Sequence, residues 1–260
     1  ERGVVFYHRG EYYAIDMPGG WMSPTKFSGR EALRRAIRRA SAKLGFPLRG
    51  PYRLMVFTEF FQYFSEIKAH MRPFPEEVRA LVWERFKSFY GVEGEGEVLV
   101  SYAFGIDGLY ATALAKEAAE ELASSFPGPV HLYSGTLSFV RGLRASYPSR
   151  PKLMAFFIEM GTALGASFLQ GEPHAISRLP VLERVNPSTS LPQELVADYV
   201  AQVDEEVQVL LPPGMGNLHL VVTGAWGEAV LKQLNFSAPY EFAPVPQIWD
   251  LSQAQDALYY

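Results

Sequence analysis

The sequence predicts an α/β protein made of two similar halves, and three observations carry this prediction. A succession of three strands, a helix and a strand can be traced in residues 1–58 and again in residues 152–223. Hydrophobic residues make up 48% of the chain and charged residues 20%, which is typical of a folded globular protein. With 260 residues, the chain is long enough for one large domain or two medium-sized ones.

The first half opens with three predicted strands, GVVFYHRG, EYYAIDMPGG and WMSPTKF, which are separated by tight Gly or Pro turns. A helix follows, with Ser28 as its predicted N-cap, Leu33, Ile37 and Ala40 on its apolar stripe, and Gly45 at its end. Residues 52–58 then form a buried strand. The predicted order is therefore β-β-β-α-β.

A small separate unit is predicted at about residues 57–114. FFQYFSEIK alternates like a half-exposed strand, and PFPEEVRALVWERFKSFYG is an amphipathic helix with Pro75 in its first turn. Two further strands flank Ile106-Asp107-Gly108 as a β-hairpin. The unit is therefore β-α-β-β, and a helix, a strand and a helix are expected after it, up to residue 147.

The segment PSRP, from Pro148 to Pro151, is the predicted domain boundary, which gives domains of residues 1–150 and 151–260. In the second half, strands are expected at 152–159, 163–170, 174–179 and 218–223, and helices at 192–210 and 226–234. Brief extended pieces are expected at 240–245 and 247–249. The second half thus repeats the theme of the first at a spacing of about 150 residues.

Composition argues against several functions. A net charge of -4 and a pI near 5.8 give no electrostatic case for nucleic-acid binding. One basic run has helical spacing on a single face and consists of Arg34, Arg35, Arg38 and Arg39. This face is either a solvated helix surface or a contact for acidic lipid or an acidic partner. The chain has no cysteine and its five histidines form no HxxxH or HxH pair, so no metal site is predicted.

The order of elements and the placement of motifs resemble a known family, the actin-like cytoplasmic components of type IV pilus and type II secretion inner-membrane platforms (PilM and the cytoplasmic part of GspL). EVLVSYAFGIDGLYATALAKEAAEELASSF followed by PVHLYSGTLSFVRGL is similar to this family's passage from insert hairpin to helix, strand and helix. The division protein FtsA has such an insert too. The resemblance covers nearly the whole chain and implies an actin-like fold of two ribonuclease-H-like halves.

The resemblance also implies where nucleotide motifs would lie. The family's second phosphate loop, Asp-x-Gly followed by a hydroxyl residue, corresponds to Glu159, Gly161 and Thr162. The extra methylene of glutamate places its carboxylate where a metal-bound phosphate would sit, and a plain β-turn is the alternative. The first phosphate hairpin corresponds to a turn with Arg9 and Gly10, where bulky groups occupy the phosphate position. Arg9 attracts an anion there, or the hairpin is simply part of the surface.

The adenosine loop of the family corresponds to Gly224, with Trp226 at its mouth, where the indole would crowd a nucleobase or stack on it. The alternative is that Gly224 only starts a helix. Because phosphoryl transfer depends on positioning, we expect an eroded site without catalysis and without a cofactor, and the alternative is a site that binds ATP with magnesium. An active nucleotide-binding ATPase or sugar-kinase-like enzyme is the alternative function, and an unrelated α/β binding module is a third.

By the same resemblance, the protein is expected to act as a cytoplasmic scaffold at the inner-membrane face. Its partners would be an inner-membrane assembly protein and the pilus or secretion ATPase, and a homodimer is left open. The aromatic residues of the insert form either a core packed on both sides or an exposed partner surface. The candidate partner-binding residues are Phe57, Phe60, Phe61, Phe64, Val82 and Phe86.

Overall fold

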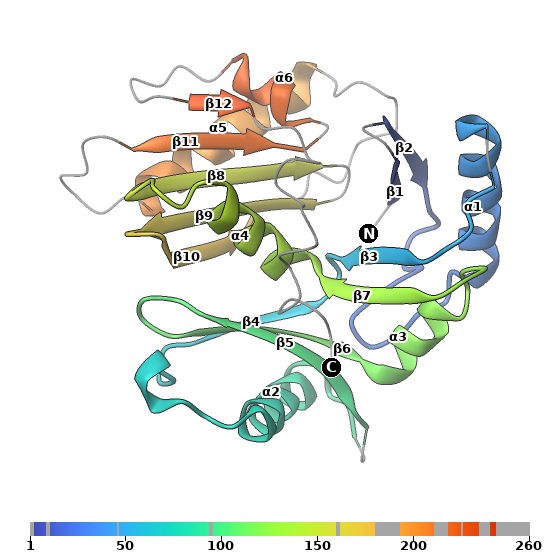
Figure 1. The fold of residues 1–260 in the computed structure, drawn as a ribbon, viewed down its shortest axis with the longest axis horizontal. Coiled ribbons are helices and arrows are strands. Elements are labelled where there is room, and N and C mark those ends of the chain that lie inside the picture. The colour runs from blue at the N-terminus through green and yellow to red at the C-terminus, as the bar shows by residue number, and fades with distance from the viewer. Residues whose placement is uncertain are drawn as a thin grey trace. The chain divides into compact units, whose positions relative to one another are not determined.

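The computed structural model of the protein describes residues 3–8, 11–45, 47–93, 96–159, 162–179, 193–210, 218–224, 226–233 and 240–242. Contacts divide the chain into two compact units, one ending at Ser138 and the other beginning at Phe139 (Figure 1). The division lies within helix α4 (Gly135–Ser146), upstream of the Pro148–Pro151 segment. The assignment of residues 1–150 and 151–260 to two ribonuclease-H-like domains stays a prediction.

The first unit begins with an antiparallel pair, β1 (Gly3–His8) and β2 (Glu11–Asp16). The third predicted strand, WMSPTKF, does not form. Met22 and Phe27 make an isolated antiparallel bridge, and the main chains of Ser23 and Lys26 close the turn between them with hydrogen bonds of 2.8 and 3.4 Å. Pro24 in the middle of this segment has no N–H to donate to a ladder, which opposes a continuous strand.

Helix α1 (Arg30–Leu44) starts after Gly29, which is its N-cap, so the prediction of Ser28 in that role is wrong. The Ser28 hydroxyl instead donates to the carbonyl oxygen of Gly20 at 3.2 Å, in the segment before the helix. The predicted end at Gly45 is confirmed. The helix buries one face, formed by Leu33, Ala36, Ile37 and Ala40.

Strand β3 (Tyr52–Val56) pairs in parallel with β7 (Val130–Ser134), and α3 (Lys116–Ala123) precedes β7. Side chains from α1, α3 and these strands share one hydrophobic core, in which Leu33, Val56 and Leu122 are buried. The expected succession of helix, strand and helix after the insert is confirmed.

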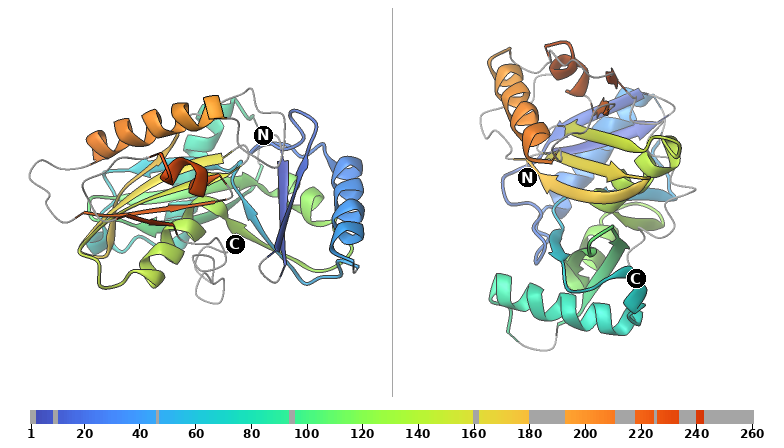
Figure 2. Two further views of the ribbon diagram at one scale, coloured as in Figure 1. Left: turned by 90° about the horizontal axis from the view of Figure 1, so that it is seen from above. Right: turned by 90° about the vertical axis from the view of Figure 1, so that its left-hand side faces the viewer.

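The insert consists of β4 (Phe60–Phe64), a short 3-10 turn η1 (Ala69–Met71), α2 (Pro75–Tyr90), β5 (Val98–Phe104) and β6 (Leu109–Ala115). Its antiparallel sheet has the order β4-β6-β5, and α2 covers one face (Figure 2). Pro75 is the first residue of α2, and the Glu77 carboxylate accepts a hydrogen bond of 2.8 Å from the Phe74 amide. The predicted β-α-β-β order is confirmed.

The second unit holds a five-stranded sheet of the order β10-β9-β8-β11-β12. Strands β8 (Lys152–Glu159), β9 (Thr162–Leu169) and β10 (Glu172–Arg178) form an antiparallel meander. Strands β11 (His219–Thr223) and β12 (Tyr240–Phe242) run parallel to β8. Numbered along the chain, the order is third, second, first, fourth, fifth, which is the ribonuclease-H arrangement. The expected pieces at 243–245 and 247–249 lie outside the described residues.

Helices cover both faces of this sheet. On one face, Met154, Phe156 and Ile158 of β8 share a core with α5 (Gln193–Leu210) and α6 (Gly227–Leu231) (Figure 2). On the other, Phe139 of α4 packs against Phe157, with ring centroids 5.8 Å apart. Strand β8 is therefore buried on both sides, which explains its continuous apolar sequence. No helix in the described ranges is long and apolar enough to cross a bilayer.

Candidate functional site

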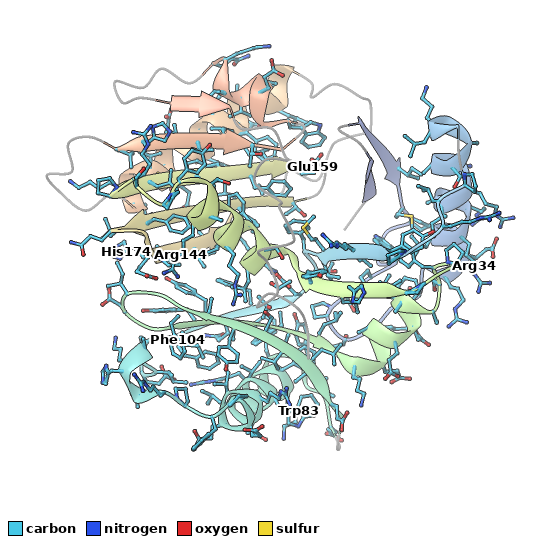
Figure 3. All side chains as sticks on the ribbon, viewed as in Figure 1. Arg34, Trp83, Phe104, Arg144, Glu159 and His174 are labelled. Carbon is cyan, nitrogen blue, oxygen red and sulfur yellow. The ribbon has the colours of Figure 1, made fainter. Side chains whose placement is uncertain are left out.

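The strand-turn-strand motif around Glu159 is formed by β8 and β9. Glu159 is the last residue of β8 and lies opposite Thr162, the first residue of β9. The Glu159 side chain is 5% exposed, whereas Thr162 is half-buried. Figure 3 shows Glu159 at the end of β8. Gly161 lies outside the described residues, as do Arg9 and Gly10 of the first hairpin.

Gly224 follows β11 at the end of the sheet where β8 also ends. Because β11 and β8 are parallel, with Thr223 opposite Phe157, their carboxyl ends meet there. Gly224 has a φ of 95°, and an added Cβ would overlap the carbonyl oxygen of Ile158 and lie 2.7 Å from its carbonyl carbon. Glycine is required at this close approach. The structure thus brings Glu159, Thr162 and Gly224 together at the carboxyl end of β8 and β11. In open α/β sheets, ligand-binding loops lie at the carboxyl ends of the strands.

Thr223 is a polar residue at this end of the sheet that the sequence did not single out. It is fully buried, and its hydroxyl has no hydrogen-bond partner among the described residues. A buried hydroxyl without a partner is uncommon, because its desolvation is not compensated. Thr223 belongs to the face of the sheet opposite the α5 core, as the alternation of β11 places Leu220 and Val222 in that core.

Trp226 does not stand at the mouth of this loop, so the expectation that its indole would crowd or stack on a nucleobase is wrong. The side chain is 6% exposed and belongs to the core between α5, α6 and the sheet. Its ring lies beside Tyr199, with centroids 6.3 Å apart. Its amide donates to the carbonyl oxygen of Ile158 at 3.2 Å, which holds the chain against β8 while the ring turns inward. The Trp226 side chain turns inward because burial of its large aromatic surface is favourable.

A buried polar cluster at the start of α4 was also missed. The Glu59 side chain is 1% exposed, and its Oε1 accepts hydrogen bonds from the Ser134 hydroxyl at 3.0 Å and the Thr136 amide at 2.9 Å. The Ser134 hydroxyl accepts in turn from the Leu137 amide at 3.0 Å. The cluster therefore satisfies the amides of Thr136 and Leu137 in the first turn and places a carboxylate at the positive end of the helix. Serine before Gly-Thr at the end of a strand is an N-cap signal, but no local pattern points to Glu59.

The aromatic residues of the insert divide between two environments. Phe60, Phe64, Val82 and Phe86 are each at most 4% exposed and pack between α2 and the sheet, so of the two alternatives these four residues form a packed core and not an exposed surface. They point to one side because residues 60 and 64 share a sheet face and residues 78, 82 and 86 share a helix face.

Phe57 and Phe61 remain partly exposed. Phe61 lies on the opposite face of the insert sheet and stacks on Tyr110, with centroids 6.1 Å apart and an interplanar angle of 11°. Burial, with smaller contributions from the phenol of Tyr63 and the charge of Asp107, raises the pKa of Tyr110 well above its usual range. Phe57 lies against Gly135, where an added Cβ would be 2.6 Å from the ring. Partner binding by these two residues stays a prediction.

A cavity of about 340 Å³ lies between the C-terminal half of α2 and the start of α3. Trp83, Phe86 and Val92 line its apolar side, and Lys116, Glu117 and Glu120 its charged side. Lys116 forms an ion pair with Glu97, which is another lining residue, and the hydrogen bond and charge of Lys116 lower the Glu97 pKa. The volume lies near the lower end of the range of small-ligand pockets, about 300–1,000 Å³. Figure 3 shows Trp83 on α2.

Comparisons with known proteins identify the fold. No family model matches the sequence, and no curated protein matches it. A solved structure described as the PilM-PilN type IV pilus biogenesis complex contains a chain that is similar over 98% of this chain and 92% of its own, with a TM-score of 0.55 and 11% identity.

A second similar structure comes from Bacteroides thetaiotaomicron VPI-5482 and is described as a protein with an actin-like ATPase fold and unknown function. The similarity covers 94% of this chain and 84% of that one, with a TM-score of 0.51 and 12% identity. The protein therefore has the actin-like fold, built of two ribonuclease-H-like halves with a small β-α-β-β insert in the first.

Proposed function

We propose that the protein is a non-catalytic, actin-like cytoplasmic scaffold of a type IV pilus or type II secretion platform, at the inner-membrane face. The observation that carries the proposal is the similarity to a chain of the PilM-PilN complex. Because that similarity extends over 98% of this chain, it includes the insert as well as both halves. The partners are an inner-membrane assembly protein and the assembly ATPase.

The state of the nucleotide motifs supports a scaffold. Glu159 is one methylene longer than the aspartate of the family motif, and its side chain is almost completely buried. A carboxylate held in this way is poorly placed to coordinate the hydrated magnesium of a nucleotide. Transfer of a phosphoryl group needs that metal and a positioned nucleophile, so loss of either removes catalysis.

An ATP-binding, sugar-kinase-like enzyme is the second candidate, and two observations favour it. Gly224 occupies the glycine position of the family's adenosine loop, and the Thr223 hydroxyl beside it is buried without a partner among the described residues. Titration calorimetry with Mg-ATP separates the two candidates. A scaffold gives no heat at millimolar nucleotide, whereas tight binding that is lost in Gly161→Asp overturns the non-catalytic proposal.

The cavity between α2 and α3 is the proposed contact for the membrane partner. It combines the Trp83 indole with charged groups of both signs, and aromatic anchors in small pockets dominate peptide interfaces. The Lys87 ammonium lies 5.3 Å from the centre of the Trp83 ring, which favours one position of the indole. We infer that the pocket takes an apolar side chain from the short cytoplasmic tail of the inner-membrane protein.

Site-specific crosslinking in cells tests this contact. A photo-crosslinking amino acid in place of Trp83 is expected to capture an inner-membrane protein with a short cytoplasmic tail. The same amino acid in place of Arg85, which is exposed on the opposite side of α2 from Trp83, is the matched control and is expected to capture much less of it. Equal capture at both positions, or capture of no membrane protein from cells that assemble the machine, contradicts the proposal.

A further inference from the structure

The exposed face of α1 concentrates positive charge. The cations are Arg30, Arg34, Arg35, Arg38, Arg39 and Lys43, all of which are exposed, and the single acid is Glu31. The helix therefore carries a net charge of +5, and since the whole chain carries -4, the remainder carries -9. The charge of this helix is opposite to that of the rest of the molecule.

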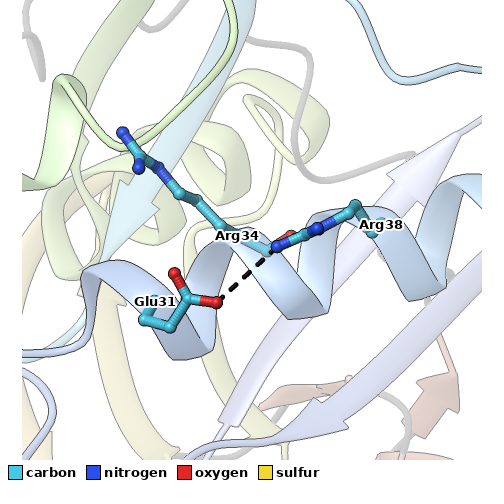
Figure 4. A network of polar contacts seen from close by, with 3 residues as sticks. All are labelled: Glu31, Arg34 and Arg38. Atoms are coloured by element: carbon cyan, nitrogen blue, oxygen red, sulfur yellow. Dashed lines mark hydrogen bonds and ion pairs between the residues drawn. The ribbon is translucent and has the colours of Figure 1, made fainter.

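Most of these cations are not neutralised by neighbouring groups. The Arg38 guanidinium lies 3.6 Å from the Glu31 carboxylate, and both side chains are about two-thirds exposed or more, so water screens the pair (Figure 4). Arg30 donates to the Ser124 hydroxyl at 3.4 Å. No ion pair is found for the side chains of Arg34, Arg35 or Arg39 within the described part of the chain. Figure 3 shows Arg34 on the outer side of α1.

The arrangement weakens the helix that carries it. Like charges four residues apart lie next to each other on a helix surface and repel. Four such pairs occur along α1: Arg30 with Arg34, Arg34 with Arg38, Arg35 with Arg39, and Arg39 with Lys43. A local arrangement that opposes folding without a compensating contact is a sign of function.

We propose that this face of α1 binds the anionic phospholipid headgroups of a membrane, with the helix lying parallel to the bilayer surface. The arginine fork matches phosphate oxygens, and the helix is about 22 Å long, so several headgroups are contacted at once. The negative remainder of the chain is repelled by the same surface, which fixes the side of the first unit that faces the lipid.

A lipid surface suits this face better than a protein interface does. Protein interfaces usually have an apolar or aromatic centre from which charges are depleted. The exposed large hydrophobic residues of the described chain lie elsewhere, on the insert and on α5, and none lies on α1. The binding of anions follows from the charge alone, whereas the choice of lipid over nucleic acid rests on the proposed function at the inner membrane.

Sedimentation with lipid vesicles tests the proposal. The protein is expected to bind vesicles that contain phosphatidylglycerol and not vesicles of phosphatidylcholine alone, and about 1 M salt is expected to abolish binding. Each cation contributes about fivefold to the affinity, so the double variant Arg35→Gln and Arg39→Gln binds about 25-fold more weakly. Because it removes like-charge repulsion, this variant is expected to unfold no more readily than the natural chain.

The matched control is Arg79→Gln with Arg85→Gln, which removes the same charge from exposed positions of α2. It is expected to bind the vesicles as the natural protein does. Equal losses in both double variants, or equal binding to both kinds of vesicle, overturn the proposal. Tighter binding of a DNA duplex or of polyglutamate than of phosphatidylglycerol vesicles, at the same salt, also overturns it. Crosslinking at Trp83 is independent, so the failure of one proposal is distinguishable from the failure of the other.

Discussion

Replacement of Gly224 by alanine tests the close contact between β11 and β8. A residue with a Cβ at a φ of 95° costs about 1–2 kcal/mol, because its Cβ approaches the following carbonyl oxygen. The new methyl group would also lie 2.7 Å from the carbonyl carbon of Ile158, whereas Cβ atoms essentially never come within 3.0 Å of a non-bonded heavy atom. The atoms that must move are main chain of a buried central strand, which adds about 1–3 kcal/mol. We expect a total loss of about 2–5 kcal/mol in the free energy of unfolding.

Gly171→Ala is the matched control for this experiment. Gly171 also has a positive φ, 81°, and lies in the same unit, but the nearest atom to an added Cβ, the carbonyl oxygen of Pro148, is 3.9 Å away. It therefore measures the backbone term alone, about 1–2 kcal/mol. Urea unfolding followed by circular dichroism gives the free energy of unfolding of each variant, and the two losses are then compared. Equal losses for Gly224→Ala and Gly171→Ala would refute the steric argument.

Three further predictions concern the first unit. Glu59→Leu leaves two buried donors at the start of α4 without their acceptor and is expected to cost about 2–4 kcal/mol in urea unfolding, whereas Glu59→Gln keeps an acceptor oxygen and costs less; equal costs would contradict this account. Burial raises the Tyr110 pKa above the unfolded value near 10.0, so its stabilising contribution is complete below pH 10 and is lost as the pH rises further. As the pH rises above 10, the free energy of unfolding of Tyr110→Phe is therefore expected to fall less steeply than that of the natural protein. The difference between the two slopes is at most about 1.4 kcal/mol per pH unit, and identical dependence of both proteins on pH would exclude this effect. Phe86→Ala, at a 1% exposed position, is expected to cost about 3–5 kcal/mol in thermal unfolding, and Phe89→Ala, at a 71% exposed position of the same helix, about 0.5 kcal/mol; similar costs would argue against the packing of the insert.

Several parts of the fold could be predicted because their signals are local. The bounds of β8 agree with the prediction at both ends, and the Pro75 start of α2 and the Gly45 end of α1 follow from residues next to each other in the chain. The strand WMSPTKF was mispredicted because its apolar residues resemble a strand while Pro24 removes a donor. The Ser28 cap was mispredicted because α1 begins one residue later, after Gly29, and the Ser28 hydroxyl is directed to the Gly20 carbonyl, eight residues away.

The candidate site was predictable only in outline. The Gly-Thr turn after β8 and the glycine after β11 are visible as motifs, and the structure brings Glu159, Thr162 and Gly224 to the carboxyl end of β8 and β11. The role of Glu59 was not visible, because its hydrogen-bond partners lie more than seventy residues away in the chain. The direction of the Trp226 indole was mispredicted for the same kind of reason, since the core that holds it comes from α5 and β8.

The sequence by itself determined the order and type of most elements, with the segment WMSPTKF as an exception, and the basic face of α1. These depend on spacing along the chain, where residues two or four positions apart share a face of a strand or helix. Only the tertiary structure decided which apolar rings are core, which carboxylate meets the start of α4 and where Gly224 touches β8. Such contacts join segments distant in sequence, and burial of surface between them, which no local pattern encodes, decides which side chains turn inward.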